Sequence, residues 1–238
     1  MTSDILDQSR WASKGRGFAI QARHRALLAA ARVVPGMRVL DLATGRGEMA
    51  VLAARVGAAV HATDLTEALV QTAVRNATRA NVVITSGVAD MRDLAGIPSG
   101  SFDIVFGCAG LHHLDKAGAR QAVAEAIRVL VPGGRALFLE PVENVRWFDF
   151  IKHCFPSRLG RPSVLNRRAW RSWEAARDDR WMSDAELLQL WPTGRIVSRL
   201  GLLQRITAAP IIERVDACLL KWKVLGAYSQ AAIVEYRA

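Results

Sequence analysis

Cysteine is scarce in this chain of 238 residues. Its three cysteines, Cys108, Cys154 and Cys218, are an odd number and lie far apart in the sequence. This distribution argues against a disulfide framework and favours a reducing compartment, so we expect a cytoplasmic protein. No Cys-x-x-Cys motif is present, and the sequence predicts no metal site.

Long apolar segments are also missing. No run of about 18 uncharged apolar residues occurs, so the sequence predicts no membrane-spanning helix. Residues 1–10 are polar and lack the apolar core of a signal peptide. Repeats, low-complexity tracts and flexible linkers are absent as well. We therefore expect a single domain over residues 1–238, which begins with helices over about residues 1–34.

Acidic residues are outnumbered, since 32 lysines and arginines stand against 22 aspartates and glutamates, a net charge of +10. Such a balance suits nucleic acid, a membrane surface or an anionic substrate, and it equally suits solvated arginine-rich faces. One basic group precedes the first predicted strand, where it forms either a basic helix face or a clamp on a ligand carboxylate. It consists of Arg10, Lys14, Arg16, Arg23, Arg25 and Arg32.

The segment Arg38–Glu48 holds the most informative pattern. A short apolar run around Asp41 enters a turn that contains Gly45 and Gly47, and a helical pattern follows at once. A strand, a tight turn and a helix start together can hold a small ligand, and glycine lets that ligand approach the backbone. The next apolar run ends in Asp64, about 20 residues further on, the spacing at which a carboxylate meets ribose hydroxyls.

Strands and helices alternate along the chain, which predicts a parallel sheet with helices on both faces. Predicted strands cover Arg38–Ala43, Ala59–Thr63, Val82–Ile84, Phe102–Phe106, Ala136–Leu139, Gly194–Leu203 and Ala231–Tyr236. Predicted helices cover Gln8–Arg32, a segment that ends near Arg55, Thr66–Ala80, Lys116–Leu130, a short helix from Ser183 to about Leu190, and Pro210–Lys223.

In their order, these segments resemble the class I S-adenosylmethionine (SAM) dependent methyltransferases. The matching segments are Val39–Gly47 for the first motif, Asp64 for the acid that ends the second strand, Gly87–Met91 for the segment that brackets the adenine, Phe102–Cys108 for the fourth strand, and Leu130–Arg135 for the turn before the fifth. The resemblance covers roughly Val33–Val142. It departs from the family at Ala43, where the first glycine of Gly-x-Gly-x-Gly usually stands.

The resemblance implies an α/β fold: a seven-stranded, Rossmann-like, doubly wound sheet, mostly parallel with an antiparallel last strand, and a helical lid insert. It also implies SAM as the cofactor, bound beyond the carboxyl ends of the strands. The residues expected to bind it are Asp41, Ala43, Gly45 and Gly47 near the methionine part, Asp64 and Leu65 at the ribose, Asp90 and Met91 at the adenine, and the backbone of Cys108.

Two adjacent histidines, His112 and His113, follow the fourth strand, beside the expected methyl position. Either histidine could act as a general base near neutral pH. The alternative is structural, because a His-His pair is common here in quinone-type and small-molecule members that resemble this chain. We predict a catalytic role for the pair and prefer His112.

A long insert, about residues 145–195, follows the fifth strand and is rich in tryptophan and arginine. We expect it to form an apolar lid over a hydrophobic small-molecule acceptor, such as a natural product, a quinone or a lipid-like compound. Two alternatives stay open: an RNA methyltransferase, or a SAM-binding catalyst or regulator that transfers no methyl group. Nucleic acid is the less favoured partner because no additional RNA-binding module is visible, and a homodimer remains open.

Overall fold

The computed structural model describes residues 21–145, 150, 154, 162–175, 181–201, 215, 218–220 and 223–238. Most of the predicted first helix, much of the predicted lid and most of the predicted helix Pro210–Lys223 lie outside these residues. In the part of the chain that is described, no helix has the length and apolar character needed to cross a membrane.

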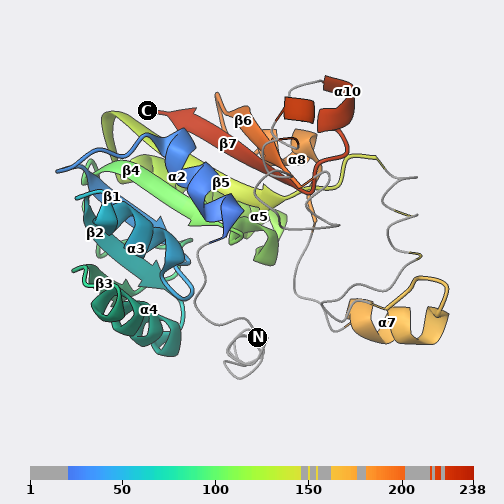
Figure 1. Ribbon diagram of the computed structural model, residues 1–238, viewed down its shortest axis with the longest axis horizontal. Coiled ribbons are helices and arrows are strands. Elements are labelled where there is room, and N and C mark those ends of the chain that lie inside the picture. Colours follow the sequence, from blue (N-terminus) through green and yellow to red (C-terminus); the bar gives the residue numbers. More distant parts are fainter. Residues whose placement is uncertain are drawn as a thin grey trace.

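A seven-stranded sheet forms the centre of the domain, in the order β3-β2-β1-β4-β5-β7-β6 (Figure 1). Neighbouring strands from β3 through β5 pair in parallel, whereas β7 pairs antiparallel with both β5 and β6. This topology confirms the predicted doubly wound sheet. The strands are β1 (Arg38–Leu42), β2 (Ala59–Asp64), β3 (Thr85–Val88), β4 (Phe102–Cys108), β5 (Leu130–Pro141), β6 (Arg195–Leu200) and β7 (Ala231–Arg237).

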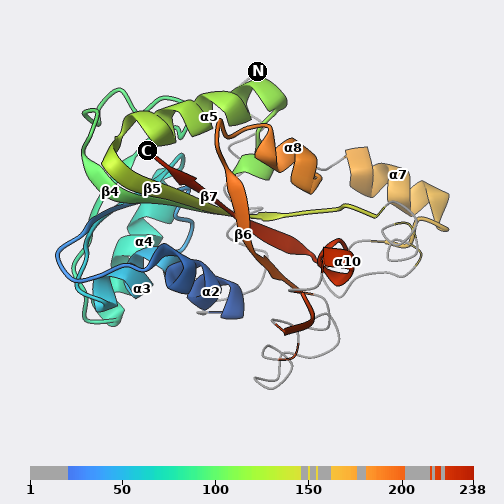
Figure 2. The same cartoon turned by 90° about the horizontal axis from the view of Figure 1, so that it is seen from above.

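Helices cover both faces of the sheet (Figure 2). Leu27 and Ala50, from the first two helices, pack on the face that carries Val39 and Leu137, and Ala122 and Leu187 pack on the face that carries Phe138. The helical elements are α2 (Ala22–Ala31), α3 (Glu48–Arg55), α4 (Glu67–Arg79), the 3-10 turn η2 (Leu111–His113), α5 (Lys116–Arg128), α7 (Arg167–Ala175), α8 (Asp184–Leu188) and α10 (Lys223–Gly226).

The third strand was predicted at Val82–Ile84, and that prediction is wrong because β3 begins at Thr85. Asn81 adopts a left-handed conformation, and the Val82 N–H donates to Ala77 O, so these residues complete the end of α4. Val83 is consequently 89% exposed despite its β-branched side chain. The fifth strand also differs, since it spans Leu130–Pro141 rather than Ala136–Leu139.

The end of the predicted lid belongs to the domain core instead. Ser183 caps α8 through the predicted capping box with Glu186, which fixes the helix against the sheet. Trp191 follows this helix, is buried, and packs its ring 5.0 Å from that of Phe138. By contrast, α7 lies apart from the sheet in both views, beyond the carboxyl ends of the parallel strands (Figures 1 and 2).

Candidate active site

The sheet order reverses between β1 and β4, and the loops that leave these two strands diverge at this point. Ligands of open α/β sheets bind in the crevice that such a reversal creates, outside the carboxyl ends of the strands. The loop after β1 carries Ala43, Gly45 and Gly47, all with positive φ of 51°, 58° and 84°. The turn therefore needs the conformation that glycine adopts most easily, and Ala43 adopts it at a cost.

Hydrogen bonds hold this glycine loop in one shape. The Thr44 N–H donates to Thr63 O at 2.8 Å, and the Gly45 N–H donates to Asp64 Oδ2 at 2.9 Å. From α4, Asn76 Nδ2 donates to Arg46 O at 2.9 Å. The loop is thus tied to both β2 and α4 before any ligand binds, which reduces the entropy that binding must remove.

Gly45 and Gly47 serve different purposes. A Cβ atom placed on Gly45 would meet nothing within 4 Å, so the space beside this residue is open to a ligand. A Cβ atom on Gly47 would lie 2.9 Å from the Cβ of Ala73, so this glycine allows α3 and α4 to pack closely. The geometry supports the predicted ligand contact at Gly45 and gives Gly47 a packing role.

Two buried carboxylates, Asp41 and Asp64, lie at the ends of β1 and β2 and are only 1% and 7% exposed. Burial raises the pKa of Asp41 to about 7, against the effect of the Thr44 hydroxyl, which donates to its Oδ2 at 2.5 Å. Burial also raises the pKa of Asp64, against hydrogen bonds from Thr66 and Gly45. Both shifts arise mainly from desolvation and have no cation among their causes, so a cationic ligand would favour the ionised form of these carboxyl groups.

SAM fits this site. Its cationic groups would favour the ionised form of the desolvated Asp41, and the open space at Gly45 admits it to the backbone. Asp64 would meet the ribose, although its oxygens already accept from Gly45 and Thr66. The basic group before β1 contributes Arg23, which is close enough to Cys108 to lower the pKa of that thiol, in opposition to burial.

The residues predicted to bracket the adenine lie near this loop. The Ala89 N–H donates to Asp64 O, which places the end of β3 next to the end of β2. Asp90 forms an ion pair with Arg92, whose hydrogen bond lowers the pKa of Asp90. Met91 is buried beside the turn that contains Gly110, whereas Leu65 is 40% exposed.

Cys108 ends β4, and burial raises the pKa of its thiol to about 12. Such a thiol stays protonated near neutral pH, so the side chain is not a nucleophile. Its neighbour Ala109 adopts a left-handed conformation, with φ 62°, and donates its N–H to Leu139 O. The chain therefore turns sharply out of β4 and directs the two histidines across the end of β5.

His112 forms a buried pair with Glu140, the feature of the site that sequence reasoning missed. His112 Nδ1 lies 2.8 Å from Glu140 Oε2, and Glu140 has no exposed surface. The same carboxylate accepts the backbone N–H groups of Gly110, Leu111 and His112 at 3.0, 2.9 and 3.3 Å. Glu140 therefore fixes both the loop after β4 and the ring orientation of His112.

The ring of His113 contacts that of His112, with centroids 4.0 Å apart and planes tilted by 40°, and His113 is more exposed. Both predicted histidines therefore lie at the carboxyl end of the sheet with the glycine loop, and the Glu140 carboxylate orients the ring of His112. Within the described residues, no three His, Cys, Asp or Glu side chains are grouped so that they could hold a metal ion.

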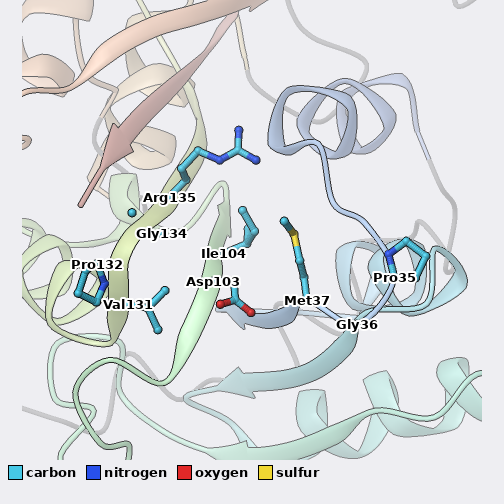
Figure 3. A pocket seen from close by; sticks show the side chains of 10 residues that line it. Pro35, Gly36, Met37, Asp103, Ile104, Val131, Pro132, Gly134 and Arg135 are labelled. Carbon is cyan, nitrogen blue, oxygen red and sulfur yellow. The ribbon is translucent and has the colours of Figure 1, made fainter.

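A separate hollow of about 530 Å³ lies at the opposite edge of the sheet (Figure 3). It is lined by Pro35 and Met37 before β1, by Asp103 at the start of β4, and by Val131 and Arg135 at the start of β5, among others. Because it adjoins the amino ends of these strands, it is remote from the site described above.

Comparisons with known proteins agree with this geometry. A family model described as a methyltransferase domain matches residues 39–134. A ubiquinone/menaquinone biosynthesis C-methyltransferase of Bordetella parapertussis is 37% identical over 116 residues, which are 46% of this chain and 43% of that protein. A ubiquinone biosynthesis O-methyltransferase of Xanthomonas campestris is 38% identical over 116 residues, 48% and 47% of the two chains. This chain thus spans less than half the length of each relative.

Among solved structures, geranyl diphosphate methyltransferase in complex with SAM superposes with a TM-score of 0.60 at 20% identity, over 90% of this chain and 83% of that chain. This likeness establishes the fold. The family model identifies residues 39–134 as a methyltransferase domain, and the ordered motifs and the sheet topology are those expected of the class I S-adenosylmethionine-dependent methyltransferases.

Proposed function

We propose that this protein transfers the methyl group of SAM to a hydrophobic small-molecule acceptor, with His112 as the general base. The observation that carries the proposal is the buried pair of His112 and Glu140 at the carboxyl end of the sheet, beside the glycine loop. The two quinone-biosynthesis relatives, one a C-methyltransferase and one an O-methyltransferase, support a small-molecule acceptor and leave its nucleophilic atom open.

When bound, SAM supplies an activated methyl group whose leaving group is a neutral thioether. The protein must then hold the nucleophile in line with this methyl group and remove its proton. The glycine loop and the carboxyl groups of Asp41 and Asp64 are suited to hold the cofactor, because they combine an open backbone with buried acidic groups.

Glu140 determines which nitrogen of His112 is available. Its Oε2 already accepts the backbone N–H of His112, so it acts as an acceptor toward Nδ1 at 2.8 Å as well. Nδ1 therefore carries the proton, and Nε2 keeps the lone pair that can accept a proton from the substrate. Glu140 acts through His112 and is a positioning residue in this scheme.

The acceptor would lie beyond the strand ends, where α7 stands. Arg167, Arg168 and Arg171 of this helix are exposed and could orient a polar or anionic group of the acceptor. The same arginines favour the alternative acceptor, RNA, through contacts with phosphates.

The test is a methyl-transfer assay with labelled SAM and a panel of phenols and prenylated quinols. We expect His112→Gln to lower kcat about 100-fold, as the loss of a general base does, while the affinity for SAM stays unchanged. His113→Gln is the matched control and should retain most of the activity. An unaltered pH–rate profile and kcat in His112→Gln would contradict the role of His112.

The alternatives predict other results. If the acceptor is RNA, a nuclease will abolish labelling in cell extracts and the quinols will remain unlabelled. If the fold binds SAM without methyl transfer, titration calorimetry will detect binding although no acceptor becomes labelled. Labelling of a nuclease-resistant, organic-soluble product is the result that the proposal requires.

A further inference from the structure

We propose that this protein has a second ligand site, a pocket for a phosphate-type anion, at the amino edge of the sheet. Its cationic groups are the guanidinium groups of Arg32, Arg195 and Arg237, which line the pocket together with Glu235. The pocket adjoins the carboxyl end of α2, so it lies at the opposite edge of the sheet from the glycine loop and the histidines.

The first observation is an excess of arginine around one buried carboxylate. Glu235 of β7 is 4% exposed and meets arginines from three strands. Arg195 of β6 approaches its Oε2 at 2.6 Å, Arg135 of β5 approaches its Oε1 at 3.3 Å, and Arg237 of β7 approaches the same Oε1 at 3.4 Å. One carboxylate cannot neutralise three guanidinium groups, so the cluster retains positive charge.

The sheet register makes this excess costly. Arg135 and Arg237 are direct cross-strand partners, and like charges in that position repel each other. Arg135 is largely buried and has a second acceptor, Ala31 O at the end of α2. Figure 3 shows its side chain directed toward this helix. The carbonyl group at the end of α2 thus provides Arg135 with an acceptor besides Glu235. Arg195 and Arg237 remain mostly exposed beside Glu235.

Arg32 adds a further cation under conformational strain. It caps α2 with φ 51°, a left-handed conformation in which glycine or asparagine is favoured over arginine. Its guanidinium has no ion pair within the described part of the chain, yet it lines the pocket. Arg32 therefore adds a cation without an ion pair to the lining of the pocket.

The size of the pocket indicates the class of ligand. Its volume of about 180 Å³ lies well below the range of about 300–1,000 Å³ that is common for drug-sized ligands. Arginine forks match the oxygens of phosphate, and three of them can bind one such group from different sides. The pocket therefore suits a single phosphate group, either free or at the end of a larger molecule.

The test measures the thermal unfolding of the intact protein while inorganic phosphate replaces chloride at constant ionic strength, so that general screening is the same throughout. We expect a saturable rise in Tm with phosphate. Arg32→Asn should raise the Tm in chloride, because asparagine tolerates the left-handed conformation, and should weaken phosphate binding about tenfold by the loss of one charge-assisted donor. This pair of opposite effects separates binding from stability.

Arg237→Gln removes a second arginine of the pocket, on β7, and should also weaken phosphate binding. Arg55→Gln is the matched control, because Arg55 is an exposed arginine in the last turn of α3, outside the pocket. An unsaturable response, or the same phosphate affinity in all three variants, would overturn the proposal. The result is independent of methyl transfer, since none of these residues belongs to the candidate active site.

Competition then distinguishes the sources of the phosphate group. A nucleoside monophosphate that displaces inorganic phosphate would identify a nucleotide-like ligand. Vesicles that contain an anionic phospholipid, compared with zwitterionic vesicles, would identify a lipid headgroup. If neither competes, the ligand is the free anion.

Discussion

Replacing Asp41 by Asn should remove a specific pH dependence of the stability. Burial raises the pKa of Asp41 from 3.8 to about 7. The folded state therefore binds the proton more tightly than the unfolded state, and Asp41 lowers the stability as the pH rises from about 4 to about 7. At 1.36 kcal/mol for each pKa unit, the full effect is about 4 kcal/mol in favour of the protonated form.

The assay is urea unfolding of the wild type and of Asp41→Asn at about pH 5, 6, 7 and 8. The comparison of the two proteins isolates Asp41, because a second group changes in the opposite direction. Burial and the neighbouring Arg23 and Arg25 lower the pKa of His24 to about 4, so His24 adds stability as the pH rises from about 4 to 6.5. Both proteins retain His24, and its contribution cancels in the difference.

We expect the stability of Asp41→Asn relative to the wild type to increase by about 3 kcal/mol between pH 5 and pH 8, since the rest of the effect lies below pH 5, and to level off above about pH 7. Glu67→Gln, at an exposed position at the start of α4, is the control for the loss of an acidic residue. A constant difference between wild type and Asp41→Asn across this range would refute the reasoning. A cationic ligand favours the ionised carboxylate, so the affinity of the wild type for SAM should rise with pH through the same range.

Three further substitutions test the rest of the cofactor site. Asp64→Ala removes the carboxylate that accepts the Gly45 and Thr66 N–H groups and that is predicted to accept the ribose hydroxyls. Hydrogen bonds to a charged group contribute about 1.5–3 kcal/mol, so titration calorimetry should show SAM affinity reduced about tenfold or more. Gly45→Val places a branched side chain at φ 58° in the space left for the ligand, so calorimetry should detect no SAM binding, and equal binding by both proteins would exclude this residue from the site. Ala43→Gly removes the strain of a left-handed alanine, which destabilises the folded state by about 1–2 kcal/mol. Glycine also gives the unfolded chain more conformational freedom, which offsets about 0.5–1 kcal/mol of this gain. Urea unfolding should therefore show a small increase in stability.

Local patterns predicted those parts of the fold that short segments determine. The turn from β1 into α3 needs glycine at positive φ, and the sequence carries Gly45 and Gly47 there. Ser183 and Glu186 satisfy the first N–H groups of α8 and each other, so the helix start was visible in the sequence. The mostly parallel sheet with helices on both faces was predictable because the alternation of strands and helices allows few topologies.

Predictions failed where the partner of a residue lies outside the segment. Val82–Ile84 has the composition of a strand, yet the end of α4 holds Val82 through Ala77 O and delays β3 to Thr85. Trp191 was assigned to an apolar lid, and the tertiary structure buries it against Phe138. Composition cannot distinguish a tryptophan that lines a ligand from one that packs on a sheet, because both are apolar and partly enclosed.

The pair of His112 and Glu140 shows the same limit at the site itself. These residues are 28 positions apart, and their contact follows from the parallel register that places Cys108 of β4 opposite Leu139 of β5. A shift of one residue in that register would turn Glu140 to the other face of the sheet and leave His112 without its acceptor. The sequence could therefore identify a histidine after the fourth strand and an acid at the end of the fifth, but not that one carboxylate binds both the ring of His112 and the backbone of its loop. That shared contact orients His112, and it exists only in the folded sheet.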